Sequence, residues 1–350
     1  MRRLSRRNLT LAVAGAGIVV SLLVATLLPV PYVILSPGPT LNTLGQQGPH
    51  HQPLIQIEGH HSYPAPGHLN LVTVSYQGGP GDPFNIFTAL QAWLDPHDAV
   101  VPQAVLFPAG QTQQQVSTQN TKDMATSQQT ATAAAFCQLG IKFTMQDTVV
   151  AVLKGYPAAG LLRSGDVITA VDGTPVTCRT GAGALIRAHP PGTPITLTVQ
   201  RDGAAESLTV KTADVSGHAV VGIDVAESYR GFPFNVKINV GDIGGPSAGL
   251  MFALGIVDKL TGRNLTAGKF IAGTGELVSA DGTVGPIGGI QQKMAGARDA
   301  GATVFLTPAA NCPDTAGAVP SGLRLVKVSS LAGAVSALQA LASGRGVPGC

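Results

Sequence analysis

The stretch GDIGGPSAGLMF, residues 241–252, decides how this chain folds and what it does. A glycine-rich turn leads here into apolar residues at helical spacing, which predicts a buried helix that stops at Gly262. Ser247 stands where that helix begins. One interpretation is ordinary helix-entry chemistry, because serine caps free amides and proline suits a helix start. The other is a nucleophile near the positive end of the helix dipole, which could stabilise an oxyanion.

A serine nucleophile needs a base, and the sequence offers a lysine rather than a histidine. Only His218 lies near this motif in the C-terminal part, and no ordered Ser, Asp, His pattern occurs. Lys293 follows a second glycine-rich turn in GTVGPIGGIQQKMAGARDAGA, residues 282–302. A free lysine, with a pKa near ~10.4, is too protonated to deprotonate a serine at neutral pH, so Lys293 must be desolvated. The apolar neighbours that could desolvate it are Ile287, Ile290 and Met294.

Three motifs occur in order around these two residues. They are GPSAG at 245–249, GTGE at 273–276, and GPIGGI at 285–290 followed by Lys293. Together they resemble the proteolytic domain of the Lon family. The resemblance covers about 232–341, including FLTPAAN at 305–311. It implies an α/β (α+β) Lon-type proteolytic domain, which we place at 214–345.

The resemblance to the Lon family also implies roles for individual residues. Ser247 would be the nucleophile and Lys293 the general base of a Ser–Lys dyad, and Thr274 would orient the lysine. The turn residues that could stabilise the oxyanion are Gly245, Pro246 and Ala248. ATP-dependent members of the family carry a motor domain, but no G-x-x-x-x-G-K-[ST] phosphate loop occurs in this sequence. We therefore expect ATP-independent proteolysis without a cofactor.

Upstream of these motifs, VVAVLKGYPAAGLLRSGDVITAVDGTPV at 149–176 has a different texture. Its Gly-Asp and Asp-Gly pairs predict turns between short strands. The segment resembles the PDZ domains of bacterial proteases over about 137–212, which implies a mainly-β domain at 136–213. Such domains bind an extended peptide beside an open sheet edge and hold its carboxylate with backbone amides. The residues expected to form the carboxylate-binding loop are Leu139, Gly140 and Ile141.

The N-terminus predicts one transmembrane helix. Four arginines within residues 1–8 precede LTLAVAGAGIVVSLLVATLLPV at 9–30, which has no charged side chain and as a helix would span about 33 Å. A cleaved signal peptide is the alternative. However, the apolar run is longer than a signal core, and LLPVPYVIL offers no small-x-small cleavage site. By the positive-inside rule, residues 1–8 form a cytoplasmic tail and the chain after Pro31 lies outside the cytoplasm.

Two segments separate the predicted anchor from the predicted PDZ domain. Residues 31–110 are expected to be an extracytoplasmic, strand-rich segment, because apolar and polar residues alternate around Val72 and Val74. Residues 111–135 form a polar run that becomes rich in alanine, which predicts a linker leading into a helix. No carboxylate stands at regular ligand spacing among the histidines of this part, so we expect surface or loop histidines and no metal site. These histidines are His50, His51, His60, His61, His68 and His97.

Four cysteines without C-x-x-C spacing predict neither a zinc site nor a thioredoxin-like motif. Outside the cytoplasm they could form two disulfides in any of three connectivities. Our hypothesis pairs Cys137 with Cys178 and Cys312 with Cys350, because each pair then lies inside one predicted domain. The alternative is four free buried thiols.

The whole arrangement resembles membrane-anchored bacterial proteases that combine a PDZ domain with a Lon-like domain. We expect a single-pass protein of the cell membrane that hydrolyses protein substrates, with the PDZ domain recruiting or gating them. The net charge of +3 includes the four N-terminal arginines, so the rest of the chain is nearly neutral. It shows no basic stripe suited to nucleic acid. By family resemblance, six copies could assemble into a ring. The alternative function is a catalytically silent, membrane-tethered scaffold whose PDZ domain binds protein C-termini.

Overall fold

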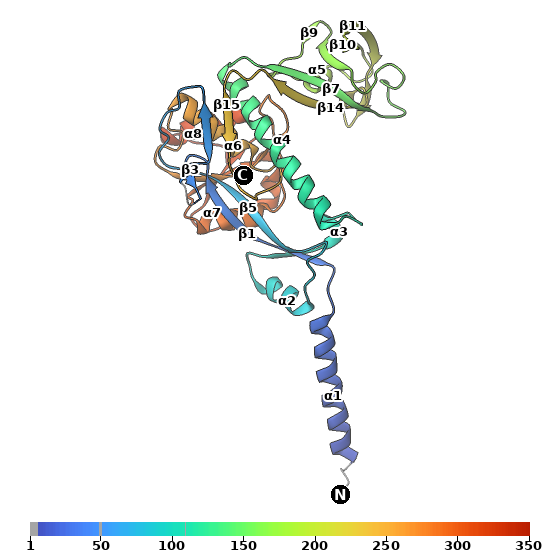
Figure 1. The fold of residues 1–350 in the computed structure, drawn as a ribbon, viewed down its shortest axis with the longest axis vertical. Helices are drawn as coiled ribbons and strands as arrows, with labels where there is room; N and C mark the ends of the chain where they lie inside the picture. Colours follow the sequence, from blue (N-terminus) through green and yellow to red (C-terminus); the bar gives the residue numbers. More distant parts are fainter. Residues whose placement is uncertain (1–5, 49–50, 109) are drawn as a thin grey trace.

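A mixed sheet of six strands forms the centre of the larger domain, in the order β20-β19-β16-β5-β1-β6 (Figure 1). The parallel neighbours are β5 (His68–Gly78), β16 (Phe270–Gly273), β19 (Val304–Pro308) and β20 (Arg324–Val328). β1 (Tyr32–Asn42) runs antiparallel to both β5 and β6 (Ala99–Pro102). The computed structural model describes residues 6–48, 51–108 and 110–350. Residues 1–5 of the predicted cytoplasmic tail and His50 lie outside this described part.

Half of this sheet comes from the segment that the sequence sets apart as residues 31–110. Leu69 in β5 pairs with Ile271 in β16, so strands from distant parts of the chain are direct neighbours. The structure thus differs from the predicted division, which confines the α/β domain to 214–345. The reason is that alternating residues reveal a strand but do not reveal the strand with which it pairs.

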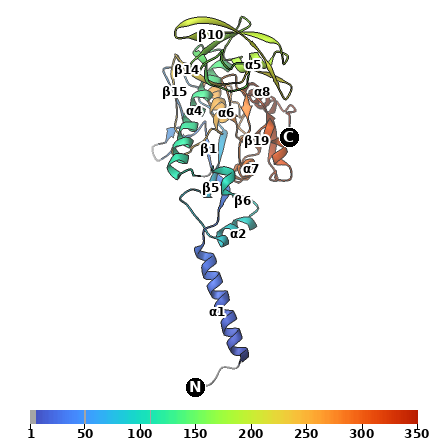
Figure 2. The ribbon, with the colours of Figure 1, turned by 90° about the vertical axis from the view of Figure 1, so that its right-hand side faces the viewer.

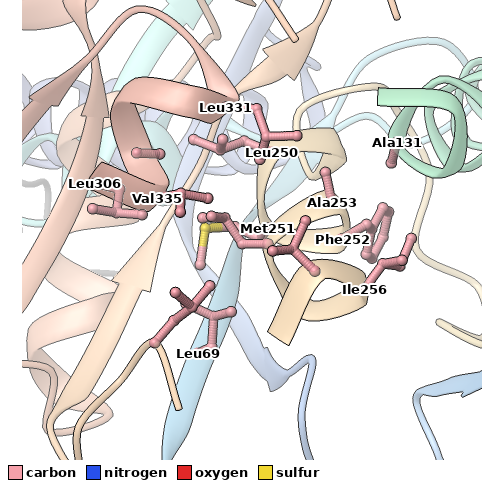
Figure 3. Packing of buried hydrophobic residues seen from close by; sticks show 14 of the residues in the cluster. Leu69, Ala131, Leu250, Met251, Phe252, Ala253, Ile256, Leu306, Leu331 and Val335 are labelled. Atoms are coloured by element: carbon pink, nitrogen blue, oxygen red, sulfur yellow. The ribbon is translucent and has the colours of Figure 1, made fainter. Parts of the chain in front are cut away.

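Helices cover both faces of the sheet. On one face lie α4 (Gln113–Leu139), α6 (Gly249–Thr261) and α8 (Leu331–Ala342), and on the other lies α7 (Ile290–Asp299). Successive residues of a strand point to opposite faces. In β19, Val304 and Leu306 therefore join the core around α6, whereas Phe305 packs in the core under α7. Figure 3 shows the first core, in which side chains of the sheet, α6 and α8 meet, among them Leu69, Leu306, Leu250, Met251 and Val335.

The polar run at 111–135, predicted as a linker leading into a helix, lies almost entirely within α4, a 27-residue helix that packs along α6. Thr112 begins the helix with a capping box to Gln115, and Gly140 ends it in the left-handed conformation. Most of its buried residues are small, among them Ser127, Ala131, Ala134 and Ala135, and the larger ones include Met124 and Phe136. Because most of these side chains are short, the two helices lie close together. The run is therefore a structural element of the α/β domain and not a free linker.

The second domain is built on a separate six-stranded sheet, in the order β11-β10-β8-β7-β14 with β9 paired to β8. Its elements are β7 (Thr144–Val152), β8 (Val167–Val171), β9 (Thr174–Pro175), α5 (Ala182–Arg187), β10 (Pro194–Arg201), β11 (Ala204–Lys211) and β14 (Ile223–Arg230). Alternate residues of β10, Ile195, Leu197 and Val199, are buried in its core. β14 belongs to this sheet although it lies beyond the predicted domain end at residue 213, because it pairs with β7 along its whole length.

α1 (Arg6–Leu27) stands apart from both domains, and none of its side chains is buried. It is long and apolar enough to cross a membrane. The predicted span of 9–30 ends later than this helix, because Pro29 and Pro31 cannot continue it. Figure 1 and Figure 2 show that α1 and the second domain lie at opposite ends of the molecule, with the α/β domain between them.

Short elements complete the fold. α2 (Ile86–Leu94) and α3 (Gln103–Leu106) flank β6, and the 3-10 helix η1 (Ala309–Thr315) follows β19. The two-stranded ladders are β2 (Gln46–Gln47) with β3 (Gln52–Pro53), β4 (Ile55–Glu58) with β15 (Asn235–Ile238), β12 (Ala213–Val215) with β13 (His218–Val220), and β17 (Glu276–Leu277) with β18 (Val284–Gly285). The last ladder, called here the β17–β18 hairpin (residues 276–285), lies in the chain between Thr274 and Lys293.

Candidate active site

Ser247 lies in the turn just before α6, and its side chain does not cap that helix. The N-cap residue is Ala248, which makes no side-chain capping bond. The hydroxyl of Ser247 instead faces the amine of Lys293, with 2.8 Å between Oγ and Nζ. The structure thus favours the interpretation in which the serine is displayed for chemistry.

Lys293 reaches this serine from α7 through an apolar setting. It is 3% exposed, and its Nζ also donates to Oγ1 of Thr274 over 3.2 Å. Ile290 and Met294, next to it on α7, belong to the core under that helix. Burial lowers the pKa of Lys293 to about 8, because the ammonium ion is removed from water. About a tenth of these side chains are then neutral, and able to accept a proton, at pH 7.

A glycine brings α7 close to the sheet. Gly289, the residue before α7, has φ +66°, and a Cβ there would lie 2.7 Å from Cγ2 of Val74 in β5. A side chain would be strained by the left-handed backbone and would collide with the strand. α7 can therefore begin against β5, and this start places Lys293 within reach of Ser247.

Thr274 joins the two catalytic candidates. It follows β16 directly and is 1% exposed. Its hydroxyl donates to the carbonyl oxygen of Ser247 over 2.9 Å and accepts from Nζ of Lys293. The amide of Gly275 donates to the same carbonyl over 2.8 Å. Through its two hydrogen bonds, the hydroxyl of Thr274 fixes both the backbone of Ser247 and the direction of the Lys293 side chain.

α4 holds the turn that carries the serine, a role that the sequence does not reveal. The amide of Gly245 donates to the carbonyl of Asn120 over 2.9 Å, and Oγ of Ser127 donates to the carbonyl of Pro246 over 3.0 Å. A Cβ on Gly244 would lie 2.7 Å from Cβ of Asn120, so the turn approaches the helix too closely for a side chain. No local sequence pattern signals this contact, because the helix residues and the turn lie more than a hundred positions apart in the chain.

Two of the three predicted oxyanion residues do not suit that role. Gly245 already donates its amide to Asn120, and Pro246 has no N–H group. These residues shape the turn instead. Ala248 remains the candidate donor, because it stands at the start of α6, where backbone amides point out of the helix and favour negative charge.

The Ser247 and Lys293 side chains open into a cleft of about 800 Å³. Residues 72–76 of β5 form one wall, residues 286–288 another, and α4 a third, and Glu276 also lines the cleft. β16 pairs with β5 only at residues 68–71, so the edge of β5 that follows lies along the cleft. The site therefore combines a nucleophile, a base and a strand edge.

Comparison with known proteins assigns both domains. Residues 195–338 match the family model of the Lon protease (S16) C-terminal proteolytic domain, and residues 137–212 match that of the PDZ domain. The chain combines a PDZ domain with a Lon-type proteolytic domain. The family and the fold class expected from the sequence are thus confirmed. The Lon match begins within β10, whereas β10, β11 and β14 belong to the sheet of the PDZ domain.

Individual relatives match only in part. The Lon protease of Roseiflexus castenholzii is 44% identical over 70 residues, which are 20% of this chain and 8% of the relative. The Lon protease of Mycolicibacterium smegmatis is 33% identical over 114 residues, 32% of this chain and 14% of the relative. The chain thus spans a small part of their length. A solved PDZ domain of an SdrC-like protein from Listeria innocua is 27% identical, covers 23% of this chain and 92% of its own, and has a TM-score of 0.21.

The predicted carboxylate-binding loop of the PDZ domain is misplaced. Gly140 ends α4, and its amide donates to the carbonyl of Cys137. The amide of Ile141 donates to the carbonyl of Phe136, and Leu139 and Ile141 pack against the core of the Lon-type domain. Because these amides already close the helix, they are not free to hold a peptide carboxylate.

A groove of about 700 Å³ between β14 and α5 is the peptide-binding candidate of the PDZ domain. β14 is the last strand of its sheet, so one edge is open, as strand addition requires. Lining residues come from the turn into β14, from α5 and from the β17–β18 hairpin, among them Val221, Gly222, Ile223, Ala184, Val278 and Ser279. The sequence signal for this groove is VVGIDV at 220–225, an apolar pair and a glycine before an alternating strand.

Glu227 of β14 connects the PDZ domain to the β17–β18 hairpin. Its Oε2 accepts a hydrogen bond from the amide of Ala280 over 2.9 Å and from the hydroxyl of Tyr229 over 2.6 Å. Burial raises the pKa of Glu227, and the two hydrogen bonds act in the opposite direction. The peptide groove thus shares a wall with the chain segment that joins Thr274 to Lys293.

The structure pairs the cysteines as Cys137–Cys178 and Cys312–Cys350. Cys137 lies in the last turn of α4 and Cys178 in the PDZ domain, so the first bond ties a helix of the Lon-type domain to its neighbour. This differs from the expectation that each pair stays within one domain, because α4 extends past the predicted boundary. Over residues 6–48, 51–108 and 110–350, no three His, Cys, Asp or Glu side chains are grouped to hold a metal.

Proposed function

We propose that this protein is a membrane-anchored serine endopeptidase with Ser247 as nucleophile and Lys293 as general base. The observation that carries the proposal is the 2.8 Å contact between Oγ and Nζ, made by a lysine that is 3% exposed and has a lowered pKa. The match to the Lon proteolytic domain supports peptide-bond hydrolysis as the reaction.

The reaction is acyl transfer in two halves. Neutral Lys293 accepts the hydroxyl proton of Ser247 while Oγ attacks the peptide carbonyl carbon, and the amide of Ala248 stabilises the oxyanion. The ammonium of Lys293 then protonates the leaving amine as the C–N bond breaks. In the second half, Lys293 takes a proton from water, the hydroxide attacks the acyl carbon, and Ser247 leaves with the returned proton.

The substrate binds as an extended segment along the open edge of β5. Residues 72–76 line the cleft beyond the part of β5 that β16 covers, so a strand added there finds unpaired backbone groups. An extended segment cannot come from the interior of a folded domain. We therefore expect cleavage of unfolded or exposed regions, and proteomic cleavage sites confined to such regions would support this expectation.

The PDZ domain gates the Lon-type domain through the β17–β18 hairpin. A peptide in the groove contacts the hairpin directly, and Glu227 holds the hairpin through the amide of Ala280. A peptide that binds the groove is expected to change kcat for a short substrate, which itself does not engage the PDZ domain. A change confined to KM for long substrates would instead indicate recruitment.

The anchor is α1, with the arginines on its cytoplasmic side and both domains on the other side of the membrane. Proteolysis needs no ATP. Purified full-length protein in detergent is therefore expected to cleave an unfolded substrate equally well with and without nucleotide. A hexameric ring is the assembly that we propose by analogy with Lon-like domains. A monomeric mass in light scattering at every working concentration would contradict the ring.

The test of the main proposal compares new protein termini in membranes of cells that carry either the wild-type chain or Ser247→Ala, using mass spectrometry. Termini that vanish with Ser247→Ala, and that purified wild-type protein regenerates, support the endopeptidase. Ser343→Ala, at the exposed end of α8, is the matched control and should leave all termini unchanged. An identical set of termini for Ser247→Ala at equal protein abundance would favour the PDZ scaffold.

A further inference from the structure

α2 is apolar on two opposite sides, and only one of them is covered by protein. The nine residues IFTALQAWL contain no charged side chain. Ala89 and Ala92 pack in a small core with Ile34 and Phe84. On the uncovered side the exposed fractions are 41% for Phe87, 47% for Leu90, 73% for Trp93 and 78% for Leu94. Positions 87, 90 and 94 recur at helical spacing, so these side chains form one continuous face.

This uncovered face lies where α1 joins the rest of the protein. The amide of Val30 donates to the carbonyl of Phe84 over 3.0 Å, and Pro29 and Asn85 form an isolated antiparallel bridge. Asn85 also caps α2, since its side chain accepts from the amides of Phe87 and Thr88. α2 is therefore fastened within a few residues of the end of the membrane-crossing helix, and Figure 1 shows it beside that end.

The composition of the face fits lipid better than water. Soluble proteins scatter exposed apolar side chains singly, and a contiguous patch marks a surface that something covers. Trp93, the only tryptophan of the chain, is its most distinctive member. Tryptophan concentrates at the membrane interface, because its ring is apolar and its indole N–H still reaches polar headgroups.

We propose that α2 lies in the bilayer interface on the catalytic side of the membrane, with Phe87, Leu90, Trp93 and Leu94 in the boundary between headgroups and acyl chains. The proposal rests on α1 being an anchor, because α1 brings α2 to the bilayer. Since α2 has no charged side chain, the association depends on apolar burial and not on anionic lipid.

A second attachment point restricts how the catalytic domains can tilt on the membrane. α1 alone would fix only the point at which the chain leaves the membrane. With α2 also seated in the interface, the α/β domain keeps one face toward the lipid and the cleft stays at a set height. Substrates are then segments that reach this height, such as extracytoplasmic tails of membrane proteins.

Trp93 provides the test, because it is the only tryptophan. Full-length protein is reconstituted in phosphatidylcholine vesicles, and its tryptophan emission is compared with that in vesicles whose lipid is brominated near the carbonyl end of the acyl chains. We expect a blue-shifted emission and roughly twofold lower intensity in the brominated vesicles, with little quenching by aqueous acrylamide. Replacing both Leu90 and Leu94 by Gln should weaken the bromine quenching, whereas Leu153→Gln in the distant PDZ domain should not.

Each other result has a distinct meaning. Acrylamide quenching without bromine quenching, in protein that resists alkaline extraction, overturns the proposal for α2 while α1 remains an anchor. Protection from both quenchers also overturns it, because a second copy of the chain then covers the face. If alkaline extraction releases the protein, α1 is not a membrane anchor, and the proposal for α2 fails together with it. The bromine and acrylamide quenching of Trp93 in the wild-type protein tests the proposal even if the double variant does not fold.

Discussion

Arg201 in the PDZ domain and Lys293 in the Lon-type domain are both largely withdrawn from water, but their partners differ. The side chain of Arg201 is 12% exposed, and it donates to both carboxylate oxygens of Asp166, at 2.8 and 2.7 Å, and to Glu206 at 2.6 Å. Lys293 is 3% exposed and donates to two hydroxyl groups. Hydrogen bonding to Asp166 raises the pKa of Arg201, whereas burial lowers the pKa of Lys293 to about 8.

The difference separates a structural charge from a reactive one. A guanidinium held by two carboxylates stays protonated and crosslinks the strands around it. An amine buried among apolar and hydroxyl groups has a lowered pKa, so it gives up its proton readily.

Removing the amine should abolish catalysis. We expect Lys293→Met to lower kcat/KM for an unfolded substrate at least ~10⁴-fold, because Nζ of Lys293 is the basic group that contacts Oγ of Ser247. Lys259→Met is the matched control. Burial lowers the pKa of Lys259 as well, but this residue does not line the cleft, so its variant should keep wild-type activity. Substantial activity in Lys293→Met would contradict the dyad.

Activity should rise with pH and level off above the pKa of Lys293. The base works when neutral, so below a pKa of about 8 the rate is expected to fall as the amine is protonated. Between pH 9 and pH 6, kcat/KM should decrease roughly a hundredfold. The measurement is a pH profile of initial rates with a substrate that does not titrate in this range. A flat profile would mean that Lys293 is not the base.

Thr274 should act as a positioning residue. Thr274→Val keeps the shape of the side chain but removes the hydroxyl that binds both Nζ of Lys293 and the carbonyl of Ser247. We expect kcat to fall roughly tenfold to a hundredfold with little change in KM. Thr274→Ser restores the hydroxyl and should recover most of the rate. Equal activity of the Ser and Val variants would show that the hydroxyl is dispensable.

The two basic residues should affect stability in opposite directions. The folded pKa of about 8 for Lys293 is below that of an exposed lysine, so its burial costs most below pH 8 and nothing above the unfolded pKa. Lys293→Met should therefore raise the free energy of unfolding at pH 7 by up to about 3 kcal/mol, with no gain above pH ~10.5. Thermal unfolding in detergent at several pH values measures this.

Arg201→Met should lower the melting temperature in the same assay. Its hydrogen bond to Asp166 lowers the pKa of that carboxyl, so the stabilisation is complete above the ordinary carboxyl pKa. It is lost as pH falls through the lowered folded value. The Met variant should therefore differ most from wild type near neutral pH and least in strong acid. A variant as stable as wild type at pH 7 would show that the ion pair contributes nothing.

The catalytic candidates could be predicted from the sequence because their signals are local. Ser247, Thr274 and Lys293 each stand beside a glycine-rich turn whose letters are visible in one window. Asn120 and Ser127 could not be predicted, because their contacts with the serine turn join residues more than a hundred positions apart. An isolated polar run also gives no sign that one side of it is buried.

The misplaced carboxylate-binding loop of the PDZ domain shows a second reason why a prediction from the sequence can be wrong. The resemblance to PDZ domains covers about 137–212, and the carboxylate-binding loop that it predicts stands near the start of this segment, at Gly140. In the structure the strand beside the groove is β14, which follows the end of this segment and pairs with β7. Strand order in a sheet is not sequence order, and no periodicity within a strand reports its neighbour.

The pairing of Leu69 with Ile271 also governs when a new copy becomes an enzyme. A ribosome makes β1 and β5 first, then the PDZ domain, and only later the strands that complete the sheet. Until β16 emerges, one edge of β5 has no neighbour, and Lys293 has not yet been translated. If Lys293 is the base that we propose, a nascent or truncated chain lacks proteolytic activity but exposes an unpaired strand edge that favours aggregation. Unfinished copies then need protection from aggregation and not inhibition of their activity.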